Sequence, residues 1–326
     1  MTTRRQFVQL GAAALAGAAL PVAALAQGSA QNWPTRPIRA MIPFAAGSSL
    51  DIVGRIVMDP LAAQLGQPIV IENRGGAGGT IGTALVAKSD PDGYSILIQA
   101  SAHSAAPAAY SNIGYDVAKD FIAVIPFGTL PNVTVVSPAS GIKTLKDLVA
   151  KAKSGPITYA SAGTGNANHV AAEMFKMMTG IEMVHVPYRG GAPALIDLVG
   201  GRVQVMFADT LTAGEQLKGG LIRALAVATP QRSPVLPDAP PISDTVPGFD
   251  ASSWWGIGAP RGTPEEIVNK LNQSINAGLA DPKLRARFAD MGAQIIGGSP
   301  ADFGKMIADE TDKWGKVVKF AGASAE

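Results

Sequence analysis

The sequence has no cysteine and only three histidines among its 326 residues, and these absences exclude several kinds of site. Without cysteine the chain has no disulfide framework, no zinc ribbon, no cysteine nucleophile and no acyl anchor at a lipobox. No two of His103, His169 and His185 are close enough in sequence to form a metal-binding pair on one helix face. We therefore predict no metal site and no cofactor.

Charge is also scarce, which limits the partners that the chain can have. Charged residues make up 16% of the sequence, against about 25% in a typical globular protein, and the formal net charge is +2. That charge is too small for a nucleic-acid footprint, so no nucleic acid is expected as a partner. The apolar fraction of 47% is ordinary, and the length is ample for about two domains with sizeable cores.

The first 26 residues have the layout of a secretory signal. Paired arginines at positions 4 and 5 precede an apolar run over residues 8–20, and Ala-Leu-Ala ends at Ala26. This layout predicts cleavage after Ala26. Cleavage would remove both arginines and no acid, which leaves 25 basic and 25 acidic residues among the remaining 300.

The sequence leaves the export route open. The two arginines with Phe7 resemble a twin-arginine signal, whereas Val8 and Gln9 replace the usual Leu and Lys and leave the general secretory route open. An uncleaved membrane anchor is the alternative, but glycine and alanine make the run weakly hydrophobic for a spanning helix. No other stretch could span a membrane, so we expect a soluble mature protein in the periplasm.

Short apolar strands alternate with amphipathic helices along the mature chain, which predicts an α/β fold. The expected strands are Ile38–Phe44, Ile69–Ile71, Tyr94–Ile98, Val133–Val136, Ile157–Ala160, Met183–Val186, Val203–Phe207 and Leu225–Ala228. The proline-rich stretch 233–249 interrupts this alternation and indicates a loop or crossover.

Two helix starts in the C-terminal part are marked by capping patterns. Thr263, followed by Pro264 and two glutamates, predicts an N-cap with proline at the first helical position. Ser299, followed by Pro300 and then by Asp302, predicts a similar start for the last helix.

The common catalytic motifs are absent. Neither G-x-S-x-G nor G-x-G-x-x-G occurs, and there is no phosphate-binding loop with G-x-x-x-x-G-K-[ST] and no H-E-x-x-H. His169 is interpreted as a structural histidine at a helix start, and His103, which follows a strand, as a pocket residue. Nothing in the sequence assembles a catalytic set.

Small, polar residues follow three predicted strands, at residues 44–49, 100–103 and 161–166. In open α/β sheets ligands bind beyond the carboxyl ends of the strands, and helix N-termini attract anions. These segments offer the hydroxyls of Ser48, Ser101 and Thr164 but no lysine or arginine. Each segment could equally be a turn with a helix cap. The occurrence of three such segments in an exported chain without a catalytic set favours a ligand-binding function.

Motifs spread over the mature chain resemble the solute receptors of tripartite tricarboxylate transporters, also called Bug receptors. The residues that carry this resemblance are Ile42–Asp51, Glu72–Gly79, Pro91–Tyr94, Tyr159–Asn166 with His169, Val184–Ala194, Arg223–Val227, Arg232–Pro234, Leu236–Asp238, Ser253–Gly256 and Ala259–Pro260. The resemblance implies a type II periplasmic binding protein, with two α/β lobes around a ligand cleft. Lobe one would comprise 33–130 and 250–326, and lobe two 131–249.

The resemblance also implies the ligand site. Family members bind a small organic acid through backbone amides and ordered waters between the first strand–helix loop and a facing loop of lobe two. By position, the implied ligand-binding residues are Phe44, Ala46, Gly47, Ser48, Ser49, Gly163, Thr164 and Asn166, with Ser101 and His103 along the wall.

Two departures from the family pattern bear on the ligand. Gly47-Ser48-Ser49 stands where a glycine-rich triplet is common, and Ala208 follows Phe207 where many relatives carry an acid. That acid suits a ligand with an amino group, so a plain dicarboxylate or an aromatic carboxylate is expected unless Asp209 substitutes for it. Trp254 and Tyr188 are interpreted either as ligand-packing residues or as core residues.

The expected function is therefore that of a monomeric, non-enzymatic periplasmic receptor. It would deliver a small organic carboxylate to membrane subunits of a tripartite tricarboxylate-type transporter. Two alternatives stay open, namely an exported hydrolase or isomerase with an unrecognised site, and a receptor that feeds a signalling system.

Overall fold

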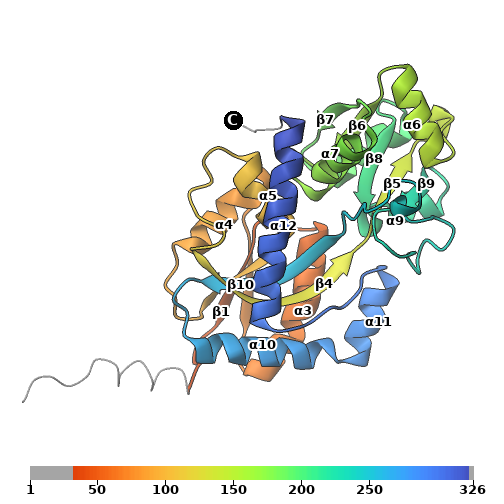
Figure 1. The fold of residues 1–326 in the computed structure, drawn as a ribbon. Helices are drawn as coiled ribbons and strands as arrows, with labels where there is room; N and C mark the ends of the chain where they lie inside the picture. Colours follow the sequence, from red (N-terminus) through yellow and green to blue (C-terminus); the bar gives the residue numbers. More distant parts are fainter. Residues whose placement is uncertain (1–31, 323–326) are drawn as a thin grey trace, which may run out of the picture.

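A computed structural model describes residues 32–322 as two α/β lobes (Figure 1). The predicted signal at residues 1–26 lies outside the described residues. Each lobe is built on one five-stranded sheet, and the α/β class predicted from the sequence is confirmed. Among the described residues, no helix has the length and apolar character needed to cross a membrane.

The first lobe is built on a mixed sheet with strand order β2-β1-β3-β10-β4. Its strands are β1 (Ile38–Ile42), β2 (Ile69–Asn73), β3 (Ser95–Ala100), β4 (Phe121–Leu130) and β10 (Ser253–Pro260). β1 pairs parallel with β2 and β3, whereas β10 runs antiparallel between β3 and β4. Because β1 and β3 are parallel neighbours, the loops that follow them leave the same edge of the sheet.

Helices cover both faces of the first sheet. They are α3 (Ser49–Leu65), α4 (Thr80–Ala87), α5 (Ala102–Ala109), α10 (Glu265–Leu279) and α11 (Pro282–Asp290), with a short 3-10 turn η1 (Ala77–Gly79) before α4. Apolar residues of α3, α10 and α11 share one core with this sheet. On its opposite face Val86 of α4 packs with Met41, Leu97 and Phe121.

The second lobe repeats this plan with strand order β7-β6-β8-β5-β9. Its elements are β5 (Asn132–Val136), η2 (Pro138–Ser140), α6 (Leu145–Ser154), β6 (Thr158–Ser161), α7 (Ala167–Thr179), β7 (Val184–Pro187), α8 (Gly191–Val199), β8 (Val205–Asp209), α9 (Thr210–Lys218), β9 (Arg223–Val227) and η3 (Ile242–Asp244). β6 lies parallel between β7 and β8, and α7 leads away from its carboxyl end.

One long helix, α12 (Pro300–Ala321), connects the two cores. Phe303 near its start packs edge-on against Trp254 of β10, at 5.4 Å between ring centroids. Trp314 and Val317 near its end are buried in the core of the second lobe. In Figure 1 this helix runs from the first sheet past α5 to α7.

Two passages between the lobes lie side by side in the described part of the chain, and one side chain ties them together. The first passage leads from β4 through Pro131 into β5, and the second leads from Phe249 into β10. The buried Asn132 amide donates to the carbonyl of Ala251 (2.8 Å) and to the hydroxyl of Ser253 (3.2 Å). The proline-rich stretch 233–249 holds only the short η3 turn.

The capping patterns of the C-terminal part have different outcomes. Ser299 caps α12 in a capping box with Asp302, as predicted. The prediction for Thr263 is wrong, because α10 begins at Glu265 with Pro264 at the cap position. The Thr263 hydroxyl donates to the carbonyl of Pro260 instead, at 2.8 Å.

Candidate functional site

The first predicted binding segment forms a loop over residues 43–48 between β1 and α3, called here the Ser48 loop. Gly47 adopts a φ of +79°, which favours glycine, and lets the chain turn sharply. Ser48 is the N-cap of α3, and its Oγ accepts a hydrogen bond from the Asp51 N–H at 3.3 Å. The N–H groups of Ser49 and Leu50 have no intrahelical acceptor because no helical turn precedes them. Ala46 and Gly47 are exposed, while Phe44, Ser48 and Ser49 are half-buried.

Asp51, a residue that the sequence analysis did not single out, holds this loop in shape. Its carboxylate is 5% exposed and accepts hydrogen bonds from Gly47 N (2.8 Å), Arg55 Nε (3.0 Å) and Asn73 Nδ2 (3.0 Å). Asn73 also donates to the carbonyl of Phe44 at 3.1 Å. The Gly47 N–H predicted to bind ligand is therefore used inside the loop.

A glycine-rich turn at residues 76–79 packs beside the Ser48 loop. Gly76, Gly78 and Gly79 all have positive φ angles. A Cβ at Gly79 would lie 3.3 Å from the Phe44 ring, and one at Gly78 would lie 2.6 Å from the Tyr110 hydroxyl. Only glycine lets both aromatic rings approach the backbone this closely.

The second predicted loop, residues 162–166 between β6 and α7, is called here the Thr164 loop. Asn166 caps α7, with its Oδ1 accepting from the Asn168 N–H at 3.1 Å. Gly163 and Gly165 have φ angles of +131° and +73°. The Thr164 carbonyl accepts a hydrogen bond from the Tyr110 hydroxyl at 2.9 Å.

Tyr110 therefore connects the glycine turn beside the Ser48 loop to the Thr164 loop of the other lobe. It follows α5 and lies between Gly78 on one side and the Thr164 loop on the other. A Cβ at Gly165 would come within 3.2 Å of its ring, so this loop also needs glycine at the contact. Tyr110 is 54 residues from Thr164 in sequence, and no local pattern indicated this contact.

Ser101 and His103, at the start of α5, are both buried. His103 lines a cavity of about 10 Å³ together with Phe44, Gln99 and Tyr115, which is close to the volume that one water needs. The ring nitrogens of His103 and the amide atoms of Gln99 have no hydrogen-bond partner within residues 32–322. Burial lowers the pKa of His103 to about 3, so the imidazole is neutral at physiological pH.

The remaining candidates have structural partners. Asp209 is the N-cap of α9, and its carboxylate accepts from the Thr212 N–H at 2.7 Å. Burial raises the pKa of the Asp209 carboxyl, against the lowering effect of the Thr212 hydrogen bonds. Trp254 is 2% exposed and packs in the core, and the Tyr188 hydroxyl donates to Asp197 at 2.7 Å. Of the two interpretations of Trp254, the structure supports the core one.

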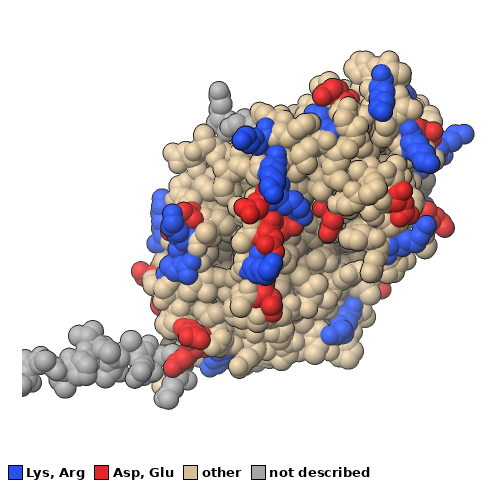
Figure 2. All heavy atoms as spheres, in the orientation of Figure 1, with Lys and Arg blue, Asp and Glu red and all other residues tan. Residues whose placement is uncertain are grey.

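No cation belongs to either loop. Arg55 lies beneath the Ser48 loop and is bonded to Asp51 and to Asn73 Oδ1 (3.1 Å). On the face shown in Figure 2, acidic and basic side chains are intermixed. On α12, Lys305 and Asp309 form an ion pair at 2.5 Å. Within the described part of the chain, no three His, Asp or Glu side chains gather closely enough to hold a metal ion.

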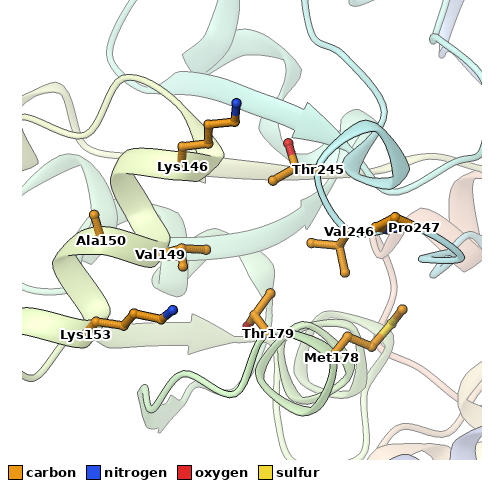
Figure 3. Close-up of a pocket in the computed structure, with 9 residues that line it drawn as sticks. All are labelled: Lys146, Val149, Ala150, Lys153, Met178, Thr179, Thr245, Val246 and Pro247. Carbon is orange, nitrogen blue, oxygen red and sulfur yellow. The ribbon is translucent and has the colours of Figure 1, made fainter.

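A groove of about 510 Å³ lies apart from the two loops, between α6, the end of α7 and the segment after η3 (Figure 3). The residues that line it are Lys146, Val149, Ala150, Lys153, Met178, Thr179, Thr245, Val246 and Pro247. None of them is among the predicted ligand-binding residues.

Comparisons with known proteins agree with this architecture. The chain is 36% identical over 318 residues to protein BugT of Bordetella pertussis, covering 95% of each chain. Among solved structures, Rpa4515 of R. palustris with adipate superposes with a TM-score of 0.83 at 38% identity, covering 89% of this chain and 98% of that one. MatC of Rhodopseudomonas palustris with bound malate superposes with a TM-score of 0.81 at 32% identity, covering 88% of this chain and 100% of that one.

The sequence profile described as "Tripartite tricarboxylate transporter family receptor" matches residues 53–323. This span begins within α3, after the Ser48 loop, and includes the rest of the first lobe and all of the second, with the Thr164 loop. The chain therefore belongs to the tripartite tricarboxylate transporter receptor family.

Proposed function

We propose that this chain binds a small organic carboxylate between its two lobes and delivers it to membrane subunits of a tripartite tricarboxylate-type transporter. One observation carries the proposal. Two loops of small residues, each at the carboxyl end of a strand, lead into helix N-termini, and Tyr110 bonds the Thr164 loop while packing on the glycine turn beside the Ser48 loop. Such loops supply N–H and hydroxyl donors for an anion. Two relatives of similar fold hold adipate and malate.

In this proposal the Ser48 loop and the start of α3 bind both oxygens of one ligand carboxylate. Ser48 can donate its hydroxyl hydrogen while its oxygen accepts from the Asp51 N–H, and Ser49 offers a first-turn N–H. Phe44, Ala46 and Gly47 shape the approach to these donors. On the facing side, Gly163, Thr164 and Asn166 contact the ligand, while Ser101 and His103 support the wall behind it.

The ligand class follows from the groups near β8. Ala208 is fully buried and apolar, and the Asp209 carboxylate is bonded to the Thr212 N–H and hydroxyl as a helix cap. Neither residue offers a free carboxylate to an ammonium group. We therefore infer that the ligand is a dicarboxylate or an aromatic carboxylate without an amino group.

The lobe boundaries and the cellular location complete the proposal. Lobe one comprises 33–130 and 250–326, with the end of α12 docked on lobe two, which comprises 131–249. The chain is exported with a signal cleaved after Ala26, and acts as a monomer in the periplasm. Solved relatives include a periplasmic binding protein, BugD, at 35% identity.

A thermal-shift screen tests the proposed function. At about a hundred times its dissociation constant, a ligand stabilises the fold by about 2.7 kcal/mol, which raises the melting temperature of a chain of this size by several degrees. We expect shifts with carboxylates such as adipate or malate, and none with their methyl esters, their amides or neutral sugars. Shifts with sugars or cations but not with carboxylates would contradict the proposal, as would turnover of an esterase panel by the purified protein.

Ligand binding is also expected to draw the lobes together. A ligand that contacts both loops favours the conformation in which those loops are closest, with rotation about the two passages near Asn132. Small-angle scattering should then show a smaller radius of gyration when the best carboxylate of the screen is saturating. An unchanged scattering profile at saturation would mean that the ligand contacts one lobe only or that the empty receptor is already closed.

A further inference from the structure

Three aromatic rings form a stack beside the Thr164 loop, with two of them buried and the third, His185, half-buried. His169 of α7 and His185 of β7 lie nearly parallel, with 4.1 Å between ring centroids, and Tyr159 of β6 stacks on His185 at 4.9 Å. Tyr159 and His169 are 0% and 2% exposed. We call these three residues the aromatic stack.

Both imidazoles are connected to the backbone of the loop. His169 Nδ1 accepts the Gly165 N–H at 3.1 Å. His185 Nε2 lies 2.6 Å from Ser161 Oγ, and the same Oγ accepts the Gly163 N–H at 3.2 Å. The two glycine N–H groups of the loop thus depend on the stack, one directly and one through Ser161. Because Ser161 is fully buried, this serine–histidine pair presents no nucleophile at the surface.

The surroundings of the stack keep both imidazoles neutral. Burial lowers the pKa of His169 to about 4, with a smaller contribution from Lys176. Burial likewise lowers the pKa of His185 to about 4, followed by the effect of His169. The buried Glu173 faces the stack from α7, but it bonds the Tyr159 hydroxyl and pairs with Lys176 at 3.0 Å.

A second acidic residue lies beside Lys176. Glu182, between α7 and β7, is 90% exposed and sits 3.9 Å from the Lys176 ammonium. The charge of Glu173 favours the imidazolium of His185, but burial and the effect of His169 outweigh it, so the pKa stays lowered.

We propose that His169 and His185 are positioning residues for ligand binding. His169 does so as a neutral acceptor of the Gly165 N–H, and His185 through its hydrogen bond with Ser161. Together they fix the Thr164 loop in its ligand-binding shape, so that acid opens the loop and weakens binding. This inference rests on the proposed function, because it gives the loop its ligand. A protonated imidazole carries a hydrogen on both nitrogens, so Nδ1 can no longer accept the Gly165 N–H. Two charged rings at this separation would also repel each other.

The direction of the pH effect follows from the lowered pKa. The folded value of about 4 lies below the ordinary 6.5 of histidine. The stabilisation that the stack gives to the loop is then complete above about pH 6.5 and is lost as the pH falls through about 4.

Three variants of His169 and of its helix test the proposal. His169→Asn places an amide oxygen where Nδ1 lies and so keeps an acceptor that does not titrate, whereas His169→Leu removes the acceptor. Phe175→Leu is the control for general destabilisation, because Phe175 is a core residue of the same helix that packs on Phe207 and Phe249 rather than on the stack.

The first measurement uses the ligand-free receptor and does not depend on the proposed function. Exchange of the Gly165 amide hydrogen, followed by NMR, should be protected at pH 7 in the wild type and in His169→Asn. It should be about tenfold or more faster in His169→Leu, because an unpaired N–H exchanges once its acceptor is lost. Equal protection in all three proteins would overturn the proposal.

The second measurement is the affinity for adipate, and for malate if adipate does not bind, between pH 7 and pH 4. We expect His169→Leu to weaken binding about tenfold at pH 7, His169→Asn to stay within about threefold of the wild type, and Phe175→Leu to leave affinity unchanged. Because the probe titrates equally in every protein, a smaller acid loss in His169→Asn than in the wild type isolates the imidazole. Parallel pH profiles, or unchanged affinity in His169→Leu, would overturn the inference and leave the proposed function standing. If the Gly165 amide is protected as expected but no carboxylate binds, the proposed function is overturned instead.

Discussion

Ser48→Asp is expected to abolish the binding of every carboxylate while leaving the melting temperature of the empty receptor nearly unchanged. Aspartate is itself a favoured N-cap, so α3 keeps its cap at this position. The new charge, however, would face the ligand carboxylate across the Ser48 loop. Two like charges about 4 Å apart at an effective dielectric constant of about 20 repel by about 4 kcal/mol, which corresponds to about a thousandfold in affinity.

Ser48→Asn is the matched control for this substitution. Asparagine has nearly the same shape as aspartate and caps helices equally well, but it carries no charge. We expect Ser48→Asn to keep thermal shifts with the carboxylates that shift the wild type. Wild-type shifts in Ser48→Asp would show that the ligand carboxylate does not bind at this loop.

Asp51→Ala is expected to lower both the stability of the fold and its affinity for carboxylates. The substitution leaves the Gly47 N–H, the Asn73 amide and the Arg55 guanidinium without their shared acceptor. Removal of one partner of such a buried polar set costs about 3 kcal/mol, which for a chain of this size lowers the melting temperature by about 5–10 °C. Because the Gly47 N–H then loses its acceptor, the Ser48 loop no longer holds its hydrogen-bond donors in position for the ligand carboxylate.

An exposed ion pair provides the control for Asp51→Ala. Asp309 pairs with Lys305 on α12, and both side chains are largely exposed. Asp309→Ala should change the free energy of unfolding by less than about 1 kcal/mol. If thermal unfolding of Asp51→Ala and Asp309→Ala gave equal losses, Asp51 would not be the support of the loop.

The pH dependence of this loss has a definite sign. Burial alone would raise the pKa of the Asp51 carboxyl, but the hydrogen bonds from Arg55, Gly47 and Asn73 outweigh burial and hold the pKa below its usual 3.8. A carboxyl with a lowered pKa adds stability above its unfolded value, and this stability is lost as the pH falls through its folded value. The difference in unfolding free energy between wild type and Asp51→Ala should therefore be full near about pH 6 and should shrink below about pH 4.

Features set by neighbours in the sequence were predictable without the structure. The strand before Phe44, the Ser299 cap of α12 and the small-residue loops between strand and helix all depend on residues within one or two helical turns. The hydrophobic period and the capping side chains act over that same range. The family assignment rests on motifs of this kind, and the matching profile confirms it.

Two strands of the first sheet, the inner β10 and the edge strand β4, were missed because their sequence pattern is broken. β4 contains Pro126 and Gly128, and β10 contains glycines at 256 and 258. These residues suit the tertiary structure rather than the strand itself, since a Cβ at Gly128 would lie 2.8 Å from the Phe288 ring. Register shifts between β10 and β4 absorb the irregularity.

The sequence by itself determined the local chemistry of this protein, namely the α/β alternation, the helix caps and two loops rich in donors without a cation. Only the tertiary structure decided what supports those loops. Asp51 is bonded to Asn73, 22 residues away, and Tyr110 to Thr164, 54 residues away. Such contacts depend on how the sheets and helices pack, because the chain has to bring distant segments together before these side chains can meet. Local periodicity carries no information about that packing.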